Sequence, residues 1–329
     1  MRVLVTGGAG YIGSVTAQAL AARGHEVEIL DDFSTGHRAA VLPGATLHEG
    51  SLLDGELLGR VLDRAFDAVM HFAAFSLVGE SVADPLRYYR NNVSGSASLL
   101  GAVTAARVPR FIFSSSAAVY GEPDVDLIPE DAPTVPVNPY GRTKLAMEWM
   151  LDDAAAASGF SAVALRYFNA CGATDGLGED HAPETHLIPR LLRSLLDPAL
   201  EFAILGGDSP TPDGTCIRDY IHVADLAEAH VLALEWTERP GLTAMNLGTQ
   251  IGHSVREVVA AVSRVTGQPL APTMAPRRPG DPPRLVAASE RARRLLGWRP
   301  TRSDLETVVA DAWRWHGAHP DGYGSGGGA

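Results

Sequence analysis

The sequence predicts an α/β protein in which a doubly wound parallel sheet is followed by a smaller α/β domain. Two observations carry this prediction. Short apolar runs alternate with helical patterns over about the first 165 residues, as in a sheet built from strand–helix–strand units. Beyond Asn169 the chain becomes richer in polar loops, which is typical of a separate, less regular unit. Right-handed crossovers then restrict the topology of the sheet.

The elements follow in order along the chain. Apolar runs predict strands at 2–6, 27–30, 68–71, 111–114 and 163–165, with helices at 11–23, 84–106 and 140–157. Polar segments at 172–183, 206–214 and 277–283 predict loops, and shorter helices are expected at 223–236 and 254–265. We therefore expect one domain over 1–168 and a second over 169–329, with segments near 216–247 able to return to the first, and a flexible Gly-rich tail at 324–329.

Composition excludes several classes of function. The chain has 27 Lys and Arg against 39 Asp and Glu, and its net charge of −12 argues against nucleic acid or an anionic membrane as a partner. Only Cys171 and Cys216 occur, too few for a disulfide scaffold, which fits a reducing cytoplasm. No secretory signal or membrane-spanning stretch is expected.

A glycine-rich turn follows the first predicted strand. In the run TGGAGYIG at 6–13, Gly7, Gly10 and Gly13 are spaced so that the turn is tight and backbone N–H groups approach a pyrophosphate. The N-terminus of the next helix adds partial positive charge toward those phosphates. The first domain is thus predicted to be of the Rossmann type and to bind a dinucleotide.

The residue after the second strand bears on the choice of dinucleotide. A carboxylate at Asp31 accepts hydrogen bonds from the adenosine ribose and repels a 2′-phosphate, which favours NAD over NADP. Arg38 nearby keeps NADP open, because a guanidinium can pair with that phosphate.

A second motif carries acid–base chemistry. Tyr140 begins a predicted helix and Lys144 lies one turn further on the same face. A nearby ammonium, like the positive charge of an oxidised nicotinamide, favours the phenolate of a tyrosine. Ser116, at the end of a predicted strand, can hydrogen-bond the reacting oxygen and relay its proton. Ser116, Tyr140 and Lys144 are the predicted catalytic set.

The chain resembles the UDP-glucose 4-epimerases of the extended short-chain dehydrogenase/reductase family over about residues 1–323. The matching words are TGGAGYIGS at 6–14, HFAA at 71–74, SSSAAVYGEP at 114–123, NPYGRTK at 138–144, LRYFN at 165–169 and DGTCIRDYIHV at 213–223. The resemblance implies inversion at C4 of a UDP-hexose through a 4-keto intermediate and bound NAD, with UDP-glucose and UDP-galactose as substrates, and it suggests a homodimer.

The resemblance also implies roles for individual residues. Arg218 and Arg278 would contact the UDP diphosphate, so an acidic protein would place positive charge locally at the phosphates. Asp281 would bind the uridine ribose. The full cofactor set is Gly7, Gly10, Tyr11, Ile12, Gly13, Asp31, Asp32, Ser34, Thr35, Ser51, Leu52, Phe72, Ala73, Ala74, Asn91, Ser114, Tyr140, Lys144 and Tyr167. The substrate set is Ser116, Tyr140, Phe168, Asn169, His186, Leu187, Arg218, Tyr220, Arg278, Asp281 and Leu285.

Three positions depart from the family pattern. Ser51 stands where an aspartate is frequent near the adenine, Ser76 replaces a lysine near the cofactor, and His186 replaces an asparagine near the UDP. None of these departures removes a chemical step.

Three alternative functions stay open. A 4-epimerase of another UDP-hexose would have the same motifs. A nucleotide-sugar 4,6-dehydratase needs an acid and a base directly after Ser116, where this chain has Ala117 and Ala118, and alanine cannot move a proton. A non-catalytic NAD-binding regulator usually lacks the tyrosine or the lysine, and both are present here.

Overall fold

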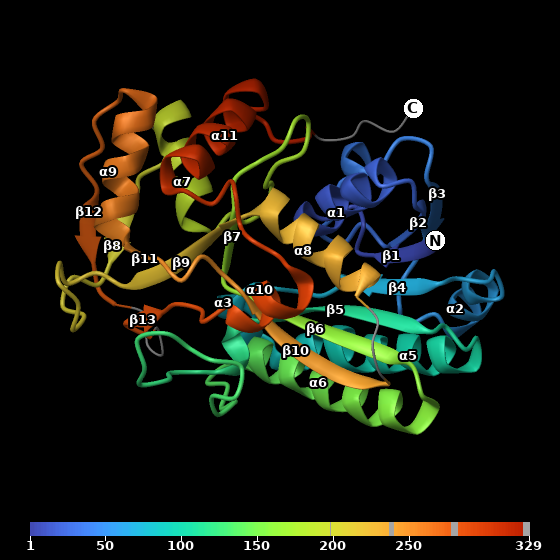
Figure 1. The fold of residues 1–329 in the computed structure, drawn as a ribbon. Helices are drawn as coiled ribbons and strands as arrows, with labels where there is room; N and C mark the ends of the chain where they lie inside the picture. The colour runs from blue at the N-terminus through green and yellow to red at the C-terminus, as the bar shows by residue number, and fades with distance from the viewer. Residues whose placement is uncertain (198, 237–239, 278–281, 325–329) are drawn as a thin grey trace.

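Seven parallel strands form the central sheet of the computed structural model, which describes residues 1–197, 199–236, 240–277 and 282–324 (Figure 1). The strand order is β10-β6-β5-β4-β1-β2-β3, so the chain reverses its direction of winding between β1 and β4. The predicted doubly wound parallel sheet is confirmed. The strands are β1 (Arg2–Thr6), β2 (Glu26–Asp31), β3 (Thr46–Glu49), β4 (Ala68–His71), β5 (Arg110–Ser116), β6 (Ser161–Tyr167) and β10 (Gly241–Leu247).

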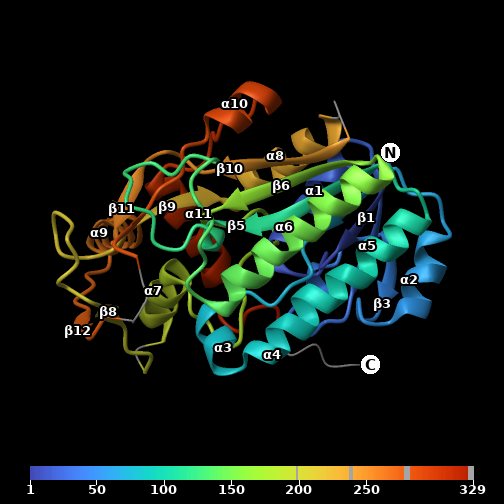
Figure 2. The ribbon, with the colours of Figure 1, turned by 90° about the horizontal axis from the view of Figure 1, so that it is seen from below.

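Helices cover both faces of this sheet (Figure 2). The alternation of side chains along β1 shows why: Val3 and Val5 belong to the apolar core under α1 and α8, while Leu4 belongs to the core on the opposite face. One layer holds α1 (Tyr11–Ala22) and α8 (Val223–Glu235), with α10 (Glu290–Leu296) against α8 and β10. The other layer holds α2 (Gly55–Leu62), α5 (Ser96–Ala105) and α6 (Pro139–Ser158).

The helix predicted over 84–106 is interrupted. Asp84 ends α3 (Val78–Ala83) and its carboxylate accepts the backbone N–H of Arg87 at 3.2 Å, which caps α4 (Pro85–Tyr88). Pro85 lacks an N–H and cannot continue the preceding helix. A π-helical turn, Tyr89–Gly95, then joins α4 to α5 and presents Asn91. Two single 3₁₀ turns elsewhere cover Arg38–Ala40 and Ala117–Val119.

The rest of the chain forms a smaller α/β layer. A four-stranded sheet has the order β11-β9-β13, with β7 also paired to β9, and β8 pairs with β12. Leu191, Val258, Val262 and Val308 belong to the apolar core that joins its helices. The elements are β7 (Asn169–Cys171), α7 (Leu187–Leu196), β8 (Ala203–Leu205), β9 (Ile217–His222), β11 (Gly252–Ser254), α9 (Val255–Thr266), β12 (Thr273–Ala275), β13 (Arg284–Leu285) and α11 (Leu305–Ala318).

After β9 the chain returns from the smaller α/β layer to the central sheet. The helix α8 packs on α1, and β10 pairs with β6 at the edge of the central sheet. The domain boundaries at 1–168 and 169–329 remain a prediction. Of the predicted loop at 277–283, residues 278–281 lie outside the described residues, as do residues 325–329 of the tail.

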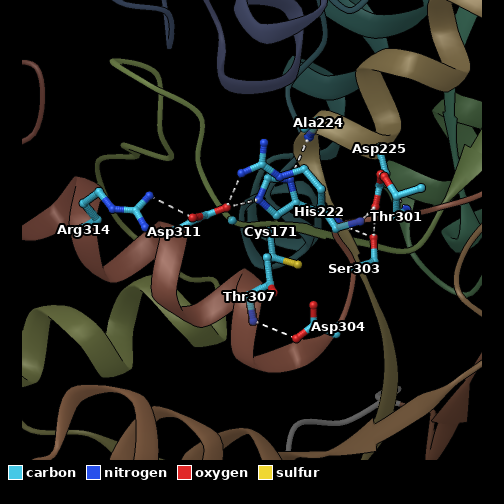
Figure 3. A network of polar contacts seen from close by, with 12 residues as sticks. Cys171, His222, Ala224, Asp225, Thr301, Ser303, Asp304, Thr307, Asp311 and Arg314 are labelled. Carbon is cyan, nitrogen blue, oxygen red and sulfur yellow. Dashed lines mark hydrogen bonds and ion pairs between the residues drawn. The ribbon is translucent and has the colours of Figure 1, made fainter.

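A buried polar network fixes the carboxyl end of β9 (Figure 3). The Nδ1 atom of His222 accepts the backbone N–H of Ala224 at 3.0 Å, so Nε2 carries the proton and donates to Asp311 of α11 at 3.2 Å. Asp225 accepts the hydroxyl of Ser303 at 2.6 Å and the backbone N–H of Thr301 at 3.0 Å. The start of α8 is thereby tied to the segment that leads into α11.

None of the described helices is long and apolar enough to cross a membrane.

Candidate active site

A cavity of about 1030 Å³ lies at the carboxyl ends of the parallel strands and extends to β9 and β13. Such a position, beside the point where strand order reverses, is where open parallel sheets bind ligands. Ser51 does not line the cavity, and its hydroxyl accepts the backbone N–H of Leu53 at 3.3 Å. Arg278 and Asp281 lie outside the described residues. The other sequence-predicted residues all line it: Gly7, Gly10, Tyr11, Ile12, Gly13, Asp31, Asp32, Ser34, Thr35, Leu52, Phe72, Ala73, Ala74, Asn91, Ser114, Ser116, Tyr140, Lys144, Tyr167, Phe168, Asn169, His186, Leu187, Arg218, Tyr220 and Leu285.

The glycine-rich turn has the close packing that a dinucleotide turn requires. Gly7 has a φ of +74°, and a Cβ there would lie 2.5 Å from the backbone nitrogen of Ala73. A Cβ on Gly13 would lie 2.1 Å from the carbonyl oxygen of Gly7. No side chain caps the N-terminus of α1 at Gly10, so its first N–H groups are left for a ligand in the cavity. These features fit the pyrophosphate of a dinucleotide.

The carboxylate at the end of β2 is held in place. Its Oδ2 accepts the N–H of Ala9 at 2.9 Å and its Oδ1 accepts the N–H of Phe33 at 2.9 Å, which joins Asp31 to the glycine-rich turn. Burial raises the pKa of Asp31, and the two backbone hydrogen bonds offset part of that rise. Arg38, which could have paired with the 2′-phosphate of NADP, is paired with Glu49 on β3.

Tyr140, Ser116 and Lys144 meet at the ends of β5 and α6. The side chain of Asn138 accepts the N–H of Gly141 at 2.9 Å and so starts α6 one residue before Tyr140. Tyr140 and Lys144 lie one turn apart on α6, and the Lys144 Nζ is 5.9 Å from the centroid of the Tyr140 ring. Both side chains line the cavity beside Ser116.

Burial determines the protonation of this set. It raises the pKa of the Tyr140 phenol, and a hydrogen bond with Ser116 offsets part of the rise. Burial lowers the pKa of Lys144 to about 7, against an opposing contribution from the carboxylate of Glu148. Lys144 is also the only lysine in the sequence. An arginine could not lose its proton at this position, whereas a lysine can.

Two strands of the smaller α/β layer, β9 and β13, also line the cavity. Arg218 and Tyr220 alternate with Asp219 on β9, so both line the cavity while Asp219 points away. Asp219 is fully buried and accepts the N–H groups of Thr249, Gln250 and Ala287, which fixes the strand. The parallel register places Leu285 of β13 opposite Arg218.

Sequence reasoning missed a cluster in the loop before α7. Glu179, His181, Glu184 and His186 each bring one potential ligand atom to within 4.8 Å of the others. Burial lowers the pKa of both imidazoles, but the two carboxylates outweigh it and raise the pKa of His181 to about 9 and of His186 to about 10. The signal was the spacing E-x-H-x-x-E-x-H at 179–186.

Comparisons with known proteins agree with this geometry. A model of the NAD dependent epimerase/dehydratase family matches residues 3–248. The UDP-glucose 4-epimerase of Streptomyces lividans is 52% identical over 326 residues, covering 98% of this chain and 98% of that protein.

Two solved structures extend the likeness. The UDP-glucose 4-epimerase from Brucella ovis, solved in complex with NAD, has a TM-score of 0.91 and 50% identity over 95% of this chain and 97% of its own. The enzyme from Bifidobacterium longum, solved with NAD⁺ and UDP, has a TM-score of 0.93 and 37% identity over 98% and 100%. The chain belongs to the NAD dependent epimerase/dehydratase family.

Proposed function

We propose that this chain is a UDP-glucose 4-epimerase, which interconverts UDP-glucose and UDP-galactose by inverting C4 of the hexose through a 4-keto intermediate. One observation carries the proposal: a single cavity joins the glycine-rich turn, the Tyr140–Ser116–Lys144 set and Arg218. The likeness to UDP-glucose 4-epimerases over nearly the whole chain supports it.

The cofactor of this reaction is NAD, which when bound accepts a hydride from C4 and returns it. The uncapped start of α1 and the close approaches at Gly7 and Gly13 fit its pyrophosphate. We assign Asp31 to the adenosine ribose, because its carboxylate is fixed by two backbone N–H groups and lines the same cavity.

We assign proton transfer at the 4-hydroxyl to Tyr140. Its phenolate would take that proton in one direction and return it in the other, and Ser116 would hydrogen-bond the same oxygen. Burial disfavours the phenolate, so the reaction depends on positive charge near the ring. The ammonium of Lys144, within the same cavity wall, is the protein's own source of that charge.

The nucleotide must be held while the sugar turns. Inversion requires both faces of C4 to meet the same reactive groups, so binding energy is best placed away from the sugar. Arg218 on strand β9 lines the same cavity as Tyr140 of α6, and a guanidinium pairs well with phosphate oxygens. We assign Arg218 to the diphosphate, and we keep Arg278 and Asp281 as predicted UDP contacts.

Leu285 is proposed to set the size of the sugar pocket. It lines the cavity beside Arg218 and also packs with Val119, Tyr120 and Leu145. A leucine leaves more room than an aromatic ring would. We therefore expect efficient exchange of UDP-glucose and UDP-galactose, with weak action on UDP-N-acetylglucosamine.

The dehydratase alternative lacks the side chains that it needs. Ala117 and Ala118 line the cavity directly after Ser116 and offer no group that moves a proton. A 4-epimerase acting on another UDP-hexose would use the same residues and differs only in its sugar pocket.

Incubation of the purified chain with UDP-glucose, followed by chromatography and mass spectrometry, tests the proposal. The epimerase predicts UDP-galactose of unchanged mass without added cofactor. Loss of water would indicate the dehydratase, and an unchanged substrate would indicate a non-catalytic protein. A parallel reaction with UDP-N-acetylglucosamine, a second UDP-hexose, tests the alternative substrate.

We also propose a cytoplasmic homodimer. Leu86 on α4 and Trp149 on α6 are 77% and 63% exposed on helices that pack together (Figure 2). Large apolar side chains exposed on neighbouring helices favour an interface. Light scattering should report a dimer for the native chain and a monomer for Trp149→Glu; a native monomer contradicts the assembly. Cys171 and Cys216 are not joined in a disulfide, which fits a reducing compartment.

A further inference from the structure

The loop between β7 and α7 brings together four side chains that metals prefer. The loop supplies Glu179, His181, Glu184 and His186, and one ligand atom from each lies within 4.8 Å of all the others. No other grouping of three or more such side chains occurs in the part of the chain that the structure describes.

Four separations between atoms of the cluster, from 2.7 to 3.6 Å, lie around the edge length of a coordination tetrahedron. Ligands about 2.0–2.1 Å from a tetrahedral ion are separated from one another by about 3.3 Å. Glu179 Oε1 lies 2.7 Å from His186 Nδ1 and 3.4 Å from His181 Nδ1. Glu184 lies 3.6 Å from His181 Nδ1 through Oε2 and 3.3 Å from His186 Nδ1 through Oε1.

The ligand atoms face one another without hydrogen bonding. The Nδ1 atoms of His181 and His186 are buried and make no hydrogen bond despite these short separations. Glu184, whose side chain is 4% exposed, uses Oε1 to accept the backbone N–H groups of Thr185 and His186, each at 2.8 Å. Its buried Oε2 has no hydrogen-bond partner. A shared cation that displaces the imidazole protons would bind the two Nδ1 atoms and the carboxylate oxygens that converge here.

We propose that Glu179, His181, Glu184 and His186 bind one divalent transition-metal ion, Zn²⁺. Two imidazole nitrogens and two carboxylate oxygens form a ligand set that Zn²⁺ accepts in tetrahedral geometry, whereas Mg²⁺ and Ca²⁺ prefer oxygen ligands alone. Four protein ligands close the site, so its role is structural. The proposal is independent of the proposed epimerase activity.

The ion would fix one wall of the cavity. The residue between the first two ligands, Asp180, already joins three parts of the chain: its carbonyl oxygen contacts His37, and its carboxylate accepts Arg193 at 2.7 Å and the N–H of Tyr323 at 2.9 Å. His186 directly precedes α7, whose Leu187 and Arg190 line the cavity. Zn²⁺ would therefore hold the 178–186 loop and the first turn of α7 together.

Metal retention tests the site directly. The full chain, free of affinity-tag histidines, is stripped with EDTA, incubated with Zn²⁺, passed through gel filtration and analysed by plasma mass spectrometry. We expect about one Zn²⁺ per chain, and about a tenth of that or less in His181→Gln and Glu184→Gln, because each loses one ligand. The matched control is His48→Gln, which removes a histidine paired with one carboxylate, Glu28, at 2.7 Å outside the cluster. Failure of the native chain to retain Zn²⁺, or equal retention by His181→Gln, overturns the proposal.

A second measurement separates binding from misfolding. Glu184→Gln keeps an oxygen for the two backbone N–H groups, and circular dichroism checks its fold. Co²⁺ in place of Zn²⁺ should give an intense visible absorption band in the native chain and in His48→Gln, and only the weak band of hydrated Co²⁺ in Glu184→Gln. Zn²⁺ should raise the melting temperature of the native chain, since it binds the folded state. An equal rise in Glu184→Gln, or a Co²⁺ band that the variant does not change, contradicts the assignment and indicates a metal-free imidazolium–carboxylate cluster.

Discussion

The ammonium of Lys144 donates a hydrogen bond of 2.7 Å to the backbone carbonyl of Ser114, near the end of β5. This bond fixes the ammonium at the carboxyl edge of the sheet, 5.9 Å from the centroid of the Tyr140 ring on the same helix. We therefore expect Lys144 to act on the phenol through charge at a fixed position. The sequence indicated the pair, but not the strand carbonyl that holds it.

The first prediction concerns the protonation of Lys144, whose pKa burial lowers to about 7. Competitive acetylation at a series of pH values, read by mass spectrometry, should give a half-labelling pH near 7 in the folded chain. The result is unambiguous because no other ε-amine exists in the sequence. The same chain in denaturant is the control, and its half-labelling pH should be about 10.4. A folded midpoint equal to the denatured one contradicts the burial argument.

The second prediction concerns Tyr140 as the proton-transfer group. Tyr140→Phe keeps the ring that packs in the cavity wall and removes only the hydroxyl, so kcat should fall by about 10²–10⁴-fold with circular dichroism and NAD content unchanged. Tyr89→Phe removes a phenol outside the cavity lining and should leave kcat within a factor of two or three, about the effect of a neutral surface change. Near-native turnover by Tyr140→Phe would exclude the phenol from the reaction.

The third prediction concerns anchoring of the diphosphate. Arg218→Ala should weaken UDP binding by about 1.5–3 kcal/mol, the loss of a charge-assisted hydrogen bond, as measured by calorimetry with UDP alone. Arg278→Ala should act in the same direction. The control is Arg256→Ala, an exposed arginine outside the cavity, which should not change the affinity. If Arg218→Ala binds UDP as tightly as the native chain does, the nucleotide is held elsewhere.

The fourth prediction concerns sugar size at Leu285. Leu285→Tyr should reduce action on UDP-N-acetylglucosamine while leaving UDP-galactose turnover largely intact, because pocket volume discriminates by about 1–3 kcal/mol. Leu285→Val, which leaves the pocket open, should retain the ratio of the two activities. An equal loss of both activities in Leu285→Tyr would mean that Leu285 only packs against Val119 and Tyr120.

The fifth prediction concerns stability in acid. Burial lowers the pKa of His71 to about 3 and of His230 to about 4, so both are neutral in the folded chain at pH 5. In the unfolded chain each of these histidines has a pKa of about 6.5 and takes up a proton below that pH. The free energy of unfolding therefore falls as the pH decreases from about 6.5 toward 4, by roughly 1.4 kcal/mol per pH unit for each histidine.

Urea unfolding at pH 7, 6 and 5 measures this effect. His230→Gln should lose one histidine's share of the pH dependence, because glutamine does not titrate. The hydrogen bond of His230 Nδ1 to the carbonyl of Leu226, at 2.8 Å, is one that a glutamine N–H can replace. A pH dependence unchanged in the variant would show that His230 does not titrate between the two states.

The central sheet could be predicted because its strands are continuous apolar runs. Val3, Leu4 and Val5 are all fully buried, since the sheet is covered on both faces. The glycine-rich turn and the Tyr140–Lys144 pair are local in sequence, and Asn138 marks the start of their helix. The sequence therefore indicated the cavity, and all but one of the predicted site residues that the structure describes line it.

Features that depend on distant contacts could not be predicted. The π-helical turn at Tyr89–Gly95 breaks an apparently continuous helical pattern, and Asn92 within it is held by backbone groups of Phe75 and by Thr143. α7 and α11 lie in sequence that appeared rich in loops, and their apolar faces are buried against each other and against α9. The convergence of Glu179 with His186 depends on the course of the loop between them.

In the proposed reaction, C4 itself is oxidised and reduced by a cofactor that stays bound. Epimerisation of UDP-glucose carrying deuterium at C4, followed by mass spectrometry and NMR of the product, tests it most directly. We expect UDP-galactose with the deuterium retained at C4 and none of it released to water, with no cofactor added. Loss of the deuterium to solvent, or its migration to another carbon, would contradict hydride transfer at C4 within this cavity.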